Sequence, residues 1–524
     1  MRPVHVAKLV LLVLTCGGIA RVASAAPGHD YNADGFDDLA IGVPVEDISG
    51  VTDCGAVHVL YGGAGGLTSA GAQFFTGLDL FGATEQDQFV GYSLTSGDFD
   101  GDGFDDLVIG APGRTIAGLT TAGAVAVVRG AATGLDLATT TTWSQDTPGI
   151  KDQVEPDPLQ VGVSGEAFGL RMAADDFNGD GFDDLAAFAL EGLGKGTKFK
   201  TRAGVVHVIF GSKTGLTAKK NQVWTQDSKG VPGVAGTDHY FGFVLATGDV
   251  DGDGRADLAV STVFEKIGAV GSGSVTILRG SKAGLTAKKA QHITQFDVGI
   301  AGYASQGFGN AVEFADLNAD GFDDLIVSAP IAFTAFGADA GEIAVCFGTK
   351  AGALTSQAVK YYAGGPELDD LGDGADGFGT ALARGNFNGD GADDLAIGSP
   401  GDDIAGQSAA GSLRTLRGGS FGIGSFAVDA LSQGTNNVAD VAEAGDRFGS
   451  SVATGDFNGD GFDDLAIGAH DETVGAVADA GMVVIVPGSA NGPLGTGSTA
   501  ITQLSAGIAD TPEADDSFGA ALRS

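Results

Sequence analysis

The chain has 524 residues and carries 28 lysines and arginines against 67 aspartates and glutamates, a formal net charge of −39. Hydrophobic residues make up 43% of it, which excludes a disordered polar chain. So negative a surface repels phosphate backbones and anionic membranes, so we expect no nucleic-acid partner.

The first predicted element is a secretory signal over residues 1–25. A basic start is followed by the short apolar run Leu9–Leu14 and by Ala23–Ala25, which is typical of a cleavage site. The run is too short to span a bilayer and no later stretch is longer, so we expect an exported chain without a membrane span, secreted or held at the cell surface. Lipid attachment at Cys16 is a disfavoured alternative, because Thr15 fits a lipobox poorly.

An acidic nine-residue segment recurs along the rest of the chain. Its seven copies begin at Asp30, Asp98, Asp176, Asp249, Asp316, Asn386 and Asp456, with start-to-start spacings of 68, 78, 73, 67, 70 and 70 residues. Self-similarity at such a period is the signature of a solenoid or a propeller.

Other sequence motifs recur with the same period as the acidic segment. A Phe-Gly pair, as in Phe168-Gly169, or its near copy Phe89-Val-Gly91 lies upstream of every copy except the first. An apolar run such as Leu107–Pro112 follows, then a Val-rich run such as Gly123–Gly130, and then a weaker one such as Gln222–Gln226. Short runs rich in Val, Ile and Leu between glycines predict strands. Four strands per repeat predict an all-β, seven-bladed β-propeller of antiparallel blades over residues 26–524.

The two ends of the repeat region complement each other. The first copy, at Asp30, has no Phe-Gly strand before it, and the final Phe518-Gly519 has no acidic segment after it. We therefore predict that the C-terminal segment supplies strand one of the blade whose strands two to four are N-terminal. Such pairing closes the ring and leaves no open sheet edge.

The acidic segments have the chemistry of a calcium loop. In the second copy, carboxylates fall at positions 1, 3, 5 and 9, namely Asp98, Asp100, Asp102 and Asp106. Glycine at position 6 permits a sharp turn, and position 7 can offer its carbonyl, a set that suits a hard cation. His and Cys are absent from all seven acidic segments, which argues against zinc and copper. Strand flanks and Asp at position 9 exclude an EF-hand, and seven copies in phase disfavour simple turns.

We predict up to seven Ca²⁺ ions, one in each loop, and expect them to be structural. The sixth loop should bind most weakly, because Asn386 replaces aspartate at position 1. The predicted ligands, at positions 1, 3, 5, 7 and 9 of each loop, are Asp30, Asn32, Asp34, Phe36, Asp38; Asp98, Asp100, Asp102, Phe104, Asp106; Asp176, Asn178, Asp180, Phe182, Asp184; Asp249, Asp251, Asp253, Arg255, Asp257; Asp316, Asn318, Asp320, Phe322, Asp324; Asn386, Asn388, Asp390, Ala392, Asp394; Asp456, Asn458, Asp460, Phe462, Asp464.

Phe-Gly, an Asp-rich loop and Gly-Ala-Pro in this order resemble the FG-GAP repeat of the integrin α-subunit head. The resemblance implies a seven-bladed propeller with calcium between strands one and two on its lower face. The third element is less regular: Ala111-Pro112 and Ala329-Pro330 keep it, whereas Ala469-His470 departs from it. Integrins also carry leg domains and a membrane span, which this sequence does not match.

We expect a monomeric, non-catalytic binding or adhesion module for an extracellular protein or glycan. The alternatives are a propeller lectin and an extracellular hydrolase or lyase of phospholipase or polysaccharide-lyase type. The loops between strands two and three and between strands four and one should carry recognition, among them the long segment 151–160 and the basic segment 192–202. His58 and His207 share one strand position and are predicted to be structural, and Cys54 and Cys346 to be buried thiols.

Overall fold

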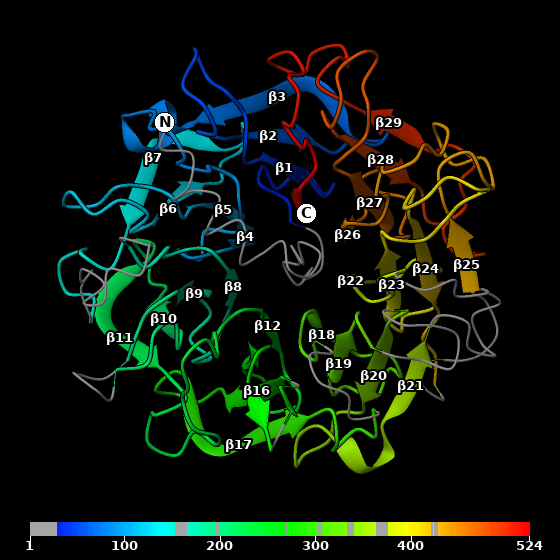
Figure 1. The fold of residues 1–524 in the computed structure, drawn as a ribbon. Coiled ribbons are helices and arrows are strands. Elements are labelled where there is room, and N and C mark those ends of the chain that lie inside the picture. Colours follow the sequence, from blue (N-terminus) through cyan, green and yellow to red (C-terminus); the bar gives the residue numbers. More distant parts are fainter. Residues whose placement is uncertain are drawn as a thin grey trace.

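The computed structural model describes residues 29–151, 165–193, 199–268, 270–271, 273–300, 307–332, 340–362, 376–420, 423 and 428–524. The predicted signal at residues 1–25, most of segment 151–160 and part of segment 192–202 lie outside these ranges. Seven four-stranded antiparallel sheets stand around one axis as the blades of a propeller (Figure 1). The predicted fold class is therefore confirmed. In the described residues no helix is long and apolar enough to cross a membrane.

The inner half of each blade consists of the two strands on either side of an acidic loop. Strand one of each blade lies nearest the axis: β4 (Leu94–Gly97), β8 (Met172–Asp175), β12 (Leu245–Gly248), β18 (Val312–Ala315), β22 (Ala381–Gly385), β26 (Ser451–Gly455) and β30 (Ala521–Arg523). Strand two follows the loop: β1 (Leu39–Val43), β5 (Asp106–Ala111), β9 (Asp184–Ala189), β13 (Asp257–Thr262), β19 (Asp324–Ala329), β23 (Asp394–Ser399) and β27 (Asp464–Ala469). Strand two is buried throughout its length in every blade, which explains its continuous apolar sequence.

The outer half of each blade is completed by a buried strand and a solvent-facing strand. Strand three is β2 (Ala56–Tyr61), β6 (Ala124–Arg129), β10 (Val205–Phe210), β16 (Ser274–Arg279), β20 (Glu342–Cys346), β24 (Ser412–Leu416) and β28 (Met482–Val486). Strand four forms the rim: β3 (Thr68–Thr76), β7 (Asp136–Trp143), β11 (Thr217–Trp224), β17 (Thr286–Thr294), β21 (Val359–Tyr362), β25 (Val428–Leu431) and β29 (Thr499–Ile501). We number the blades by their acidic loops, so that blade 1 contains β1 and blade 3 contains β9. In blade 3 strand four begins at Thr217, five residues before the predicted start, because its exposed first half lacks an apolar pattern.

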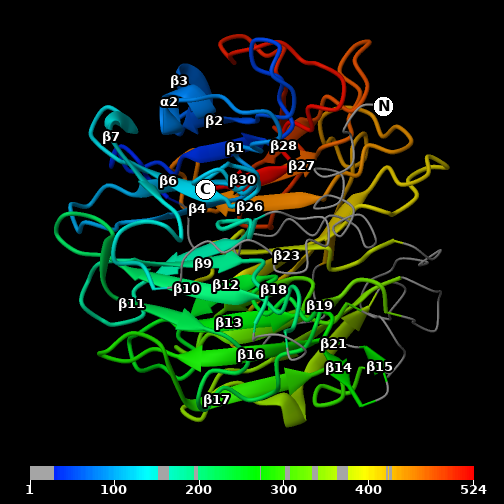
Figure 2. The same cartoon turned by 60° about the vertical axis from the view of Figure 1, so that its left-hand side comes forward.

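Within the described residues, three small elements lie outside the blades. They are the helix α2 (Gly77–Phe81), the 3₁₀ turn η2 (Thr355–Gln357) and a hairpin of β14 (Lys266–Ile267) and β15 (Val270–Gly271). Because neighbouring strands alternate in direction, the connections form two faces, which the oblique view separates (Figure 2). We call the face of the one–two and three–four connections the loop face, and that of the two–three and four–one connections the opposite face.

The Phe-Gly pairs lock each blade onto its neighbour. Phe168 is fully buried, and Gly169 has a left-handed backbone with φ +81°. A Cβ on Gly169 would lie 2.4 Å from the Cγ1 of Val125 in the preceding blade, so only glycine fits this approach. The sequence landmark is therefore a packing contact between blades.

The ring closes as predicted. Strand β30 pairs antiparallel with β1, with Leu522 opposite Ile41 and Ala521 opposite Gly42. The sheet order β3-β2-β1-β30 thus combines three N-terminal strands with one C-terminal strand, and the C-terminus lies beside β1 near the axis (Figure 1).

Candidate metal sites on the loop face

The aspartate at position 1 organises the loop backbone in every acidic loop except the sixth, where Asn386 stands. In the second loop, the Asp98 carboxylate accepts the backbone N–H groups of Gly101, Asp102 and Gly103 at 2.7, 3.2 and 3.0 Å. At position 5, Asp102 accepts the N–H of Phe104 at 3.0 Å. Turns closed by side-chain oxygens in this way hold the remaining oxygens at one end of the blade.

Position 9 begins strand two and is buried. Its carboxylate accepts the N–H of the glycine that ends strand three, as Asp106 does from Gly130 at 3.0 Å and Asp324 from Gly348 at 2.8 Å. Burial raises the pKa of this carboxyl group in every loop, to about 8 in Asp38, Asp106 and Asp184, and to about 7 in Asp257, Asp324, Asp394 and Asp464. A nearby divalent cation has the opposite effect, because it favours the charged carboxylate.

Several predicted ligands have buried oxygens without a hydrogen-bond partner. These atoms are Asn32 Oδ1, Asp100 Oδ1, Asp106 Oδ2, Asn318 Oδ1, Asp324 Oδ2, Asn386 Oδ1 and Asp394 Oδ2. Buried polar atoms normally have a partner, and an unpaired charged oxygen is costly. The donor set therefore fits a hard cation in the first, second, fifth and sixth loops, where these oxygens, the position 5 carboxylate and the position 7 carbonyl would hold it. A position 1 carboxylate joins them in every one of these loops except the sixth.

Two loops bring their carboxylates closest together. Asp98, Asp100 and Asp102 each offer an oxygen within 4.8 Å of the others, and so do Asp249, Asp251 and Asp257. An arginine from strand three reaches into each of these loops. Arg129 Nη1 lies 2.5 Å from Asp100 Oδ2, and Arg279 Nη1 lies 2.7 Å from Asp257 Oδ2.

In three further loops the position 3 asparagine donates to the position 9 carboxylate. The distances are 3.2 Å from Asn178 Nδ2 to Asp184 Oδ2, 3.3 Å from Asn388 Nδ2 to Asp394 Oδ1 and 3.0 Å from Asn458 Nδ2 to Asp464 Oδ2. The seven loops therefore have similar backbone conformations but differ in which side chain pairs with the carboxylates.

The aspartate at position 8 joins neighbouring loops. The sequence analysis did not recognise this contact. Asp183 Oδ2, at position 8 of the third loop, accepts the N–H of Asp98 at 2.9 Å, and the Asp183 N–H donates to the Asp98 carbonyl at 3.1 Å. Asp37 makes the same pair with Asp456 across the ring closure, at 2.7 and 3.2 Å. The signal in the sequence was a second aspartate before position 9 in every copy except the fourth, where Ala256 stands.

The predicted non-ligand residues behave as expected. His58 and His207 are each 1% exposed, and burial lowers the pKa of both imidazoles to about 4, so they are neutral blade residues. Cys54 and Cys346 are free and buried.

An aromatic cluster on the opposite face was not predicted. The ring centroids of Tyr240, Phe243 and Phe264 lie 5.4 to 6.3 Å apart, and the guanidinium of Arg171 lies 5.5 Å from the Phe243 ring. Phe264 is 45% exposed, although large aromatic side chains usually bury most of their surface. Tyr240 and Phe243 come from the four–one connection before β12, and Phe264 comes from the two–three connection after β13. Only the fold brings the three rings together.

Comparisons with known proteins agree with this architecture. The chain is 33% identical to phosphatidylinositol-glycan-specific phospholipase D of Bos taurus over 191 residues, 36% of this chain and 20% of that protein. It is 29% identical to integrin alpha-PS2 of Drosophila melanogaster over 282 residues, 51% of this chain and 17% of that protein. The chain thus matches about a fifth of the length of these relatives.

Among solved structures, the Dos1 propeller matches with a TM-score of 0.36 at 11% identity, over 74% of this chain and 80% of that one. Rhamnogalacturonan lyase YesW matches with a TM-score of 0.35 at 11% identity, over 86% of this chain and 73% of that one. The FG-GAP repeat profile matches seven segments, residues 22–60, 90–128, 168–209, 241–278, 308–346, 378–415 and 448–486, one for each acidic loop. This chain belongs to the FG-GAP repeat family and is an integrin-α-like seven-bladed propeller.

Proposed function

We propose that this protein is a secreted, calcium-binding propeller that serves as a non-catalytic binding or adhesion module for an extracellular protein or glycan. The observation that carries the proposal is the difference between its two faces. The loop face holds seven carboxylate turns, four of which have buried oxygens that lack partners, such as Asp106 Oδ2 and Asp324 Oδ2. The opposite face carries the cluster of Tyr240, Phe243 and exposed Phe264.

Calcium in this proposal stabilises the scaffold. Each loop except the fourth is tied to the preceding loop by its position 8 carboxylate, so an ion that fixes one loop also restrains its neighbour. Without an ion, each loop holds three to five carboxylates in nine residues, and these repel one another. The blades then hold the connections of the opposite face in a fixed arrangement, which favours a binding surface.

Recognition is assigned to the opposite face. Exposed aromatic rings stack on sugar rings and also form the anchors of protein interfaces. Phe264 is supported by Tyr240 at 5.4 Å and Phe243 at 6.1 Å, so it is held rather than free to rotate. A ligand that covers Phe264 would contact a preorganised aromatic surface.

A binding experiment tests this proposal. The full chain is presented to a glycan array and used in pull-downs against extracellular proteins, each with calcium and with a chelator. Phe264→Ala should weaken the binding that is found by about tenfold or more, as expected for an interface anchor. Phe296→Ala is the matched control, because Phe296 is 47% exposed. Binding that is unaffected by both Phe264→Ala and the chelator would contradict the proposal.

An assay for product formation distinguishes the catalytic alternative from the binding proposal. The same protein is incubated with phosphatidylinositol-glycan substrates and with pectic polysaccharides, and the products are separated by chromatography. The proposal expects no product above the buffer control. Product formed at a rate proportional to protein concentration would replace the binding proposal with an extracellular hydrolase or lyase.

A further inference from the structure

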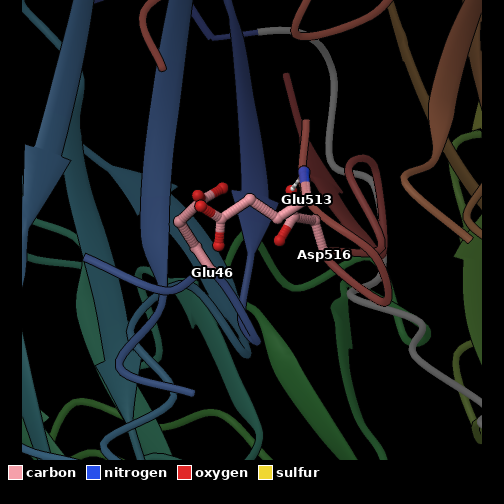
Figure 3. Close-up of side chains that lie close together, drawn as sticks. All are labelled: Glu46, Glu513 and Asp516. Carbon is pink, nitrogen blue, oxygen red and sulfur yellow. Dashed lines mark hydrogen bonds between the residues drawn. The ribbon is translucent and has the colours of Figure 1, made fainter. Parts of the chain in front are cut away.

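A second type of acidic cluster lies on the opposite face, and none of its residues belongs to a nine-residue loop. Glu46 follows β1, and Glu513 and Asp516 lie in the connection between β29 and β30. One carboxylate oxygen from each lies within 4.8 Å of the other two. The three side chains converge from two separate connections (Figure 3).

One of these carboxylates is buried and incompletely paired. Glu46 is 0% exposed, and its Oε2 accepts a hydrogen bond from Gln503 Nε2 at 2.6 Å. Its Oε1 is buried and has no hydrogen-bond partner. Asp516, which is 1% exposed, accepts the N–H of Glu513 at 2.5 Å. A carboxyl group withdrawn from water and left half-paired beside two others is either protonated or held in its charged form by a cation.

The same arrangement is repeated one blade earlier. Glu472, Glu443 and Asp446 also place carboxylate oxygens within 4.8 Å of one another. Gln433 Nε2 donates to Glu472 Oε2 at 2.6 Å, and Asp446 accepts the N–H of Glu443 at 2.5 Å. Two blades thus have the same carboxylate–glutamine construction, which makes a chance meeting of surface acids a poor explanation.

Blade 2 supplies an internal comparison. Glu46, Glu472 and Arg114 all stand eight residues after position 9 of their acidic loops, at the same turn. Arg114 Nη1 lies 3.1 Å from Glu85 Oε1, and Glu85 occupies the place of Glu513. In blade 2, therefore, the sequence itself places a cation where the other two blades place a third carboxylate.

In blades 4 and 6 the residue at the same turn position is a carboxylate that lies beside a basic side chain. Glu265 Oε2 lies 2.9 Å from His292 Nε2, and Asp402 Oδ2 lies 3.8 Å from Arg414 Nη2. A basic side chain thus stands beside this turn in blades 2, 4 and 6. For Glu46, the described residues offer the neutral Gln503 as the hydrogen-bond donor.

We propose that Glu46, Glu513 and Asp516 bind a divalent cation. Three carboxylates without nitrogen or sulfur donors select a hard ion, and calcium tolerates the irregular geometry of two converging connections. The ion would fasten the last connection of the chain to the first blade, beside the three-residue strand β30 that closes the ring. This site is separate from the seven loops and lies on the face proposed for recognition.

Calcium stoichiometry of the full chain tests this inference. Equilibrium dialysis is performed on the wild type, on the double variant Glu513→Gln/Asp516→Asn and on Glu85→Gln. We expect the double variant to bind one ion fewer at saturation. Glu85→Gln should bind as many ions as the wild type, because its site already holds Arg114. An unchanged number of ions in the double variant would overturn this inference and leave the loop ions standing, whereas no binding to the wild type would overturn both.

Stability supplies a second readout from Glu46→Gln. Glutamine keeps the size and the contact with Gln503 while removing the buried charge. We expect this variant to melt at a higher temperature than the wild type in chelator and to gain less from calcium. A purely structural role for Glu46 predicts an equal calcium gain in both proteins, and that result would contradict the inference.

Discussion

The contact between adjacent acidic loops can be broken at one residue. Asp183 accepts the N–H of Asp98 at 2.9 Å, and the two backbones are also joined by the Asp183 N–H at 3.1 Å. Asp183→Ala removes the acceptor and leaves the Asp98 N–H without a partner, which costs about 1–3 kcal/mol. Asp183→Asn retains an acceptor oxygen of the same shape. It also removes a carboxyl group whose pKa burial raises to about 7, so its cost should stay below about 1 kcal/mol.

The effect is best measured locally. A chain of this length unfolds with an entropy of roughly 1 kcal/mol/K, so 2 kcal/mol shifts Tm by only about 2 K. Amide hydrogen exchange, followed by mass spectrometry on peptides covering residues 94–106, reports the loop itself. In saturating calcium, Asp183→Ala should exchange about 5- to 150-fold faster than the wild type, and Asp183→Asn should stay within about fivefold of it. Equal exchange in the two variants would refute the interlocking of adjacent loops.

Three further predictions concern metal, protons and packing. Chelation should lower Tm, and calcium at 100 times its Kd should restore about 2.7 kcal/mol per site; an unchanged melt would contradict structural calcium. Burial lowers the pKa of His207 to about 4 from 6.5, so the unfolded chain takes up the proton at a higher pH than the folded chain. The free energy of unfolding should therefore fall by about 2 kcal/mol between neutral pH and pH 5. His207→Val should therefore lose less stability on acidification, as urea midpoints at the two pH values would reveal, and an equal loss would refute a neutral histidine. Gly101→Ala should cost about 1–3 kcal/mol more than Gly103→Ala, because both glycines have positive φ but only a Cβ on Gly101 meets Phe182, at 2.7 Å. Equal urea midpoints for the two glycine variants would show that this contact carries no energy.

The sequence predicted the ring because its signals are local and repeated. Each Phe-Gly pair, acidic loop and Val-rich run lies within one blade, and seven copies in phase leave few alternatives to a closed propeller. The closure of β30 on β1 followed from two incomplete ends that complete each other. The start of β11 was missed, because the rim strand faces solvent and its first residues, from Thr217, are polar.

The contacts between blades could not be predicted in this way. Asp183 and Asp98 are 85 residues apart, and nothing in one repeat distinguishes the position 8 aspartate that binds the preceding loop from the position 9 aspartate that binds its own blade. The cluster of Glu46, Glu513 and Asp516 joins segments more than 460 residues apart. It becomes visible only when the turn after β1 and the connection before β30 are placed on the same face.

The central claim is that the nine-residue carboxylate turns bind divalent ions and thereby hold the blades in a ring. A crystal structure of the full chain grown in millimolar calcium tests it most directly. We predict one ion in each of the first, second and fifth loops at least, with carboxylate and position 7 carbonyl oxygens at about 2.3–2.6 Å. Loops that contain only water at hydrogen-bond distances, in a ring that stays closed, would contradict the claim.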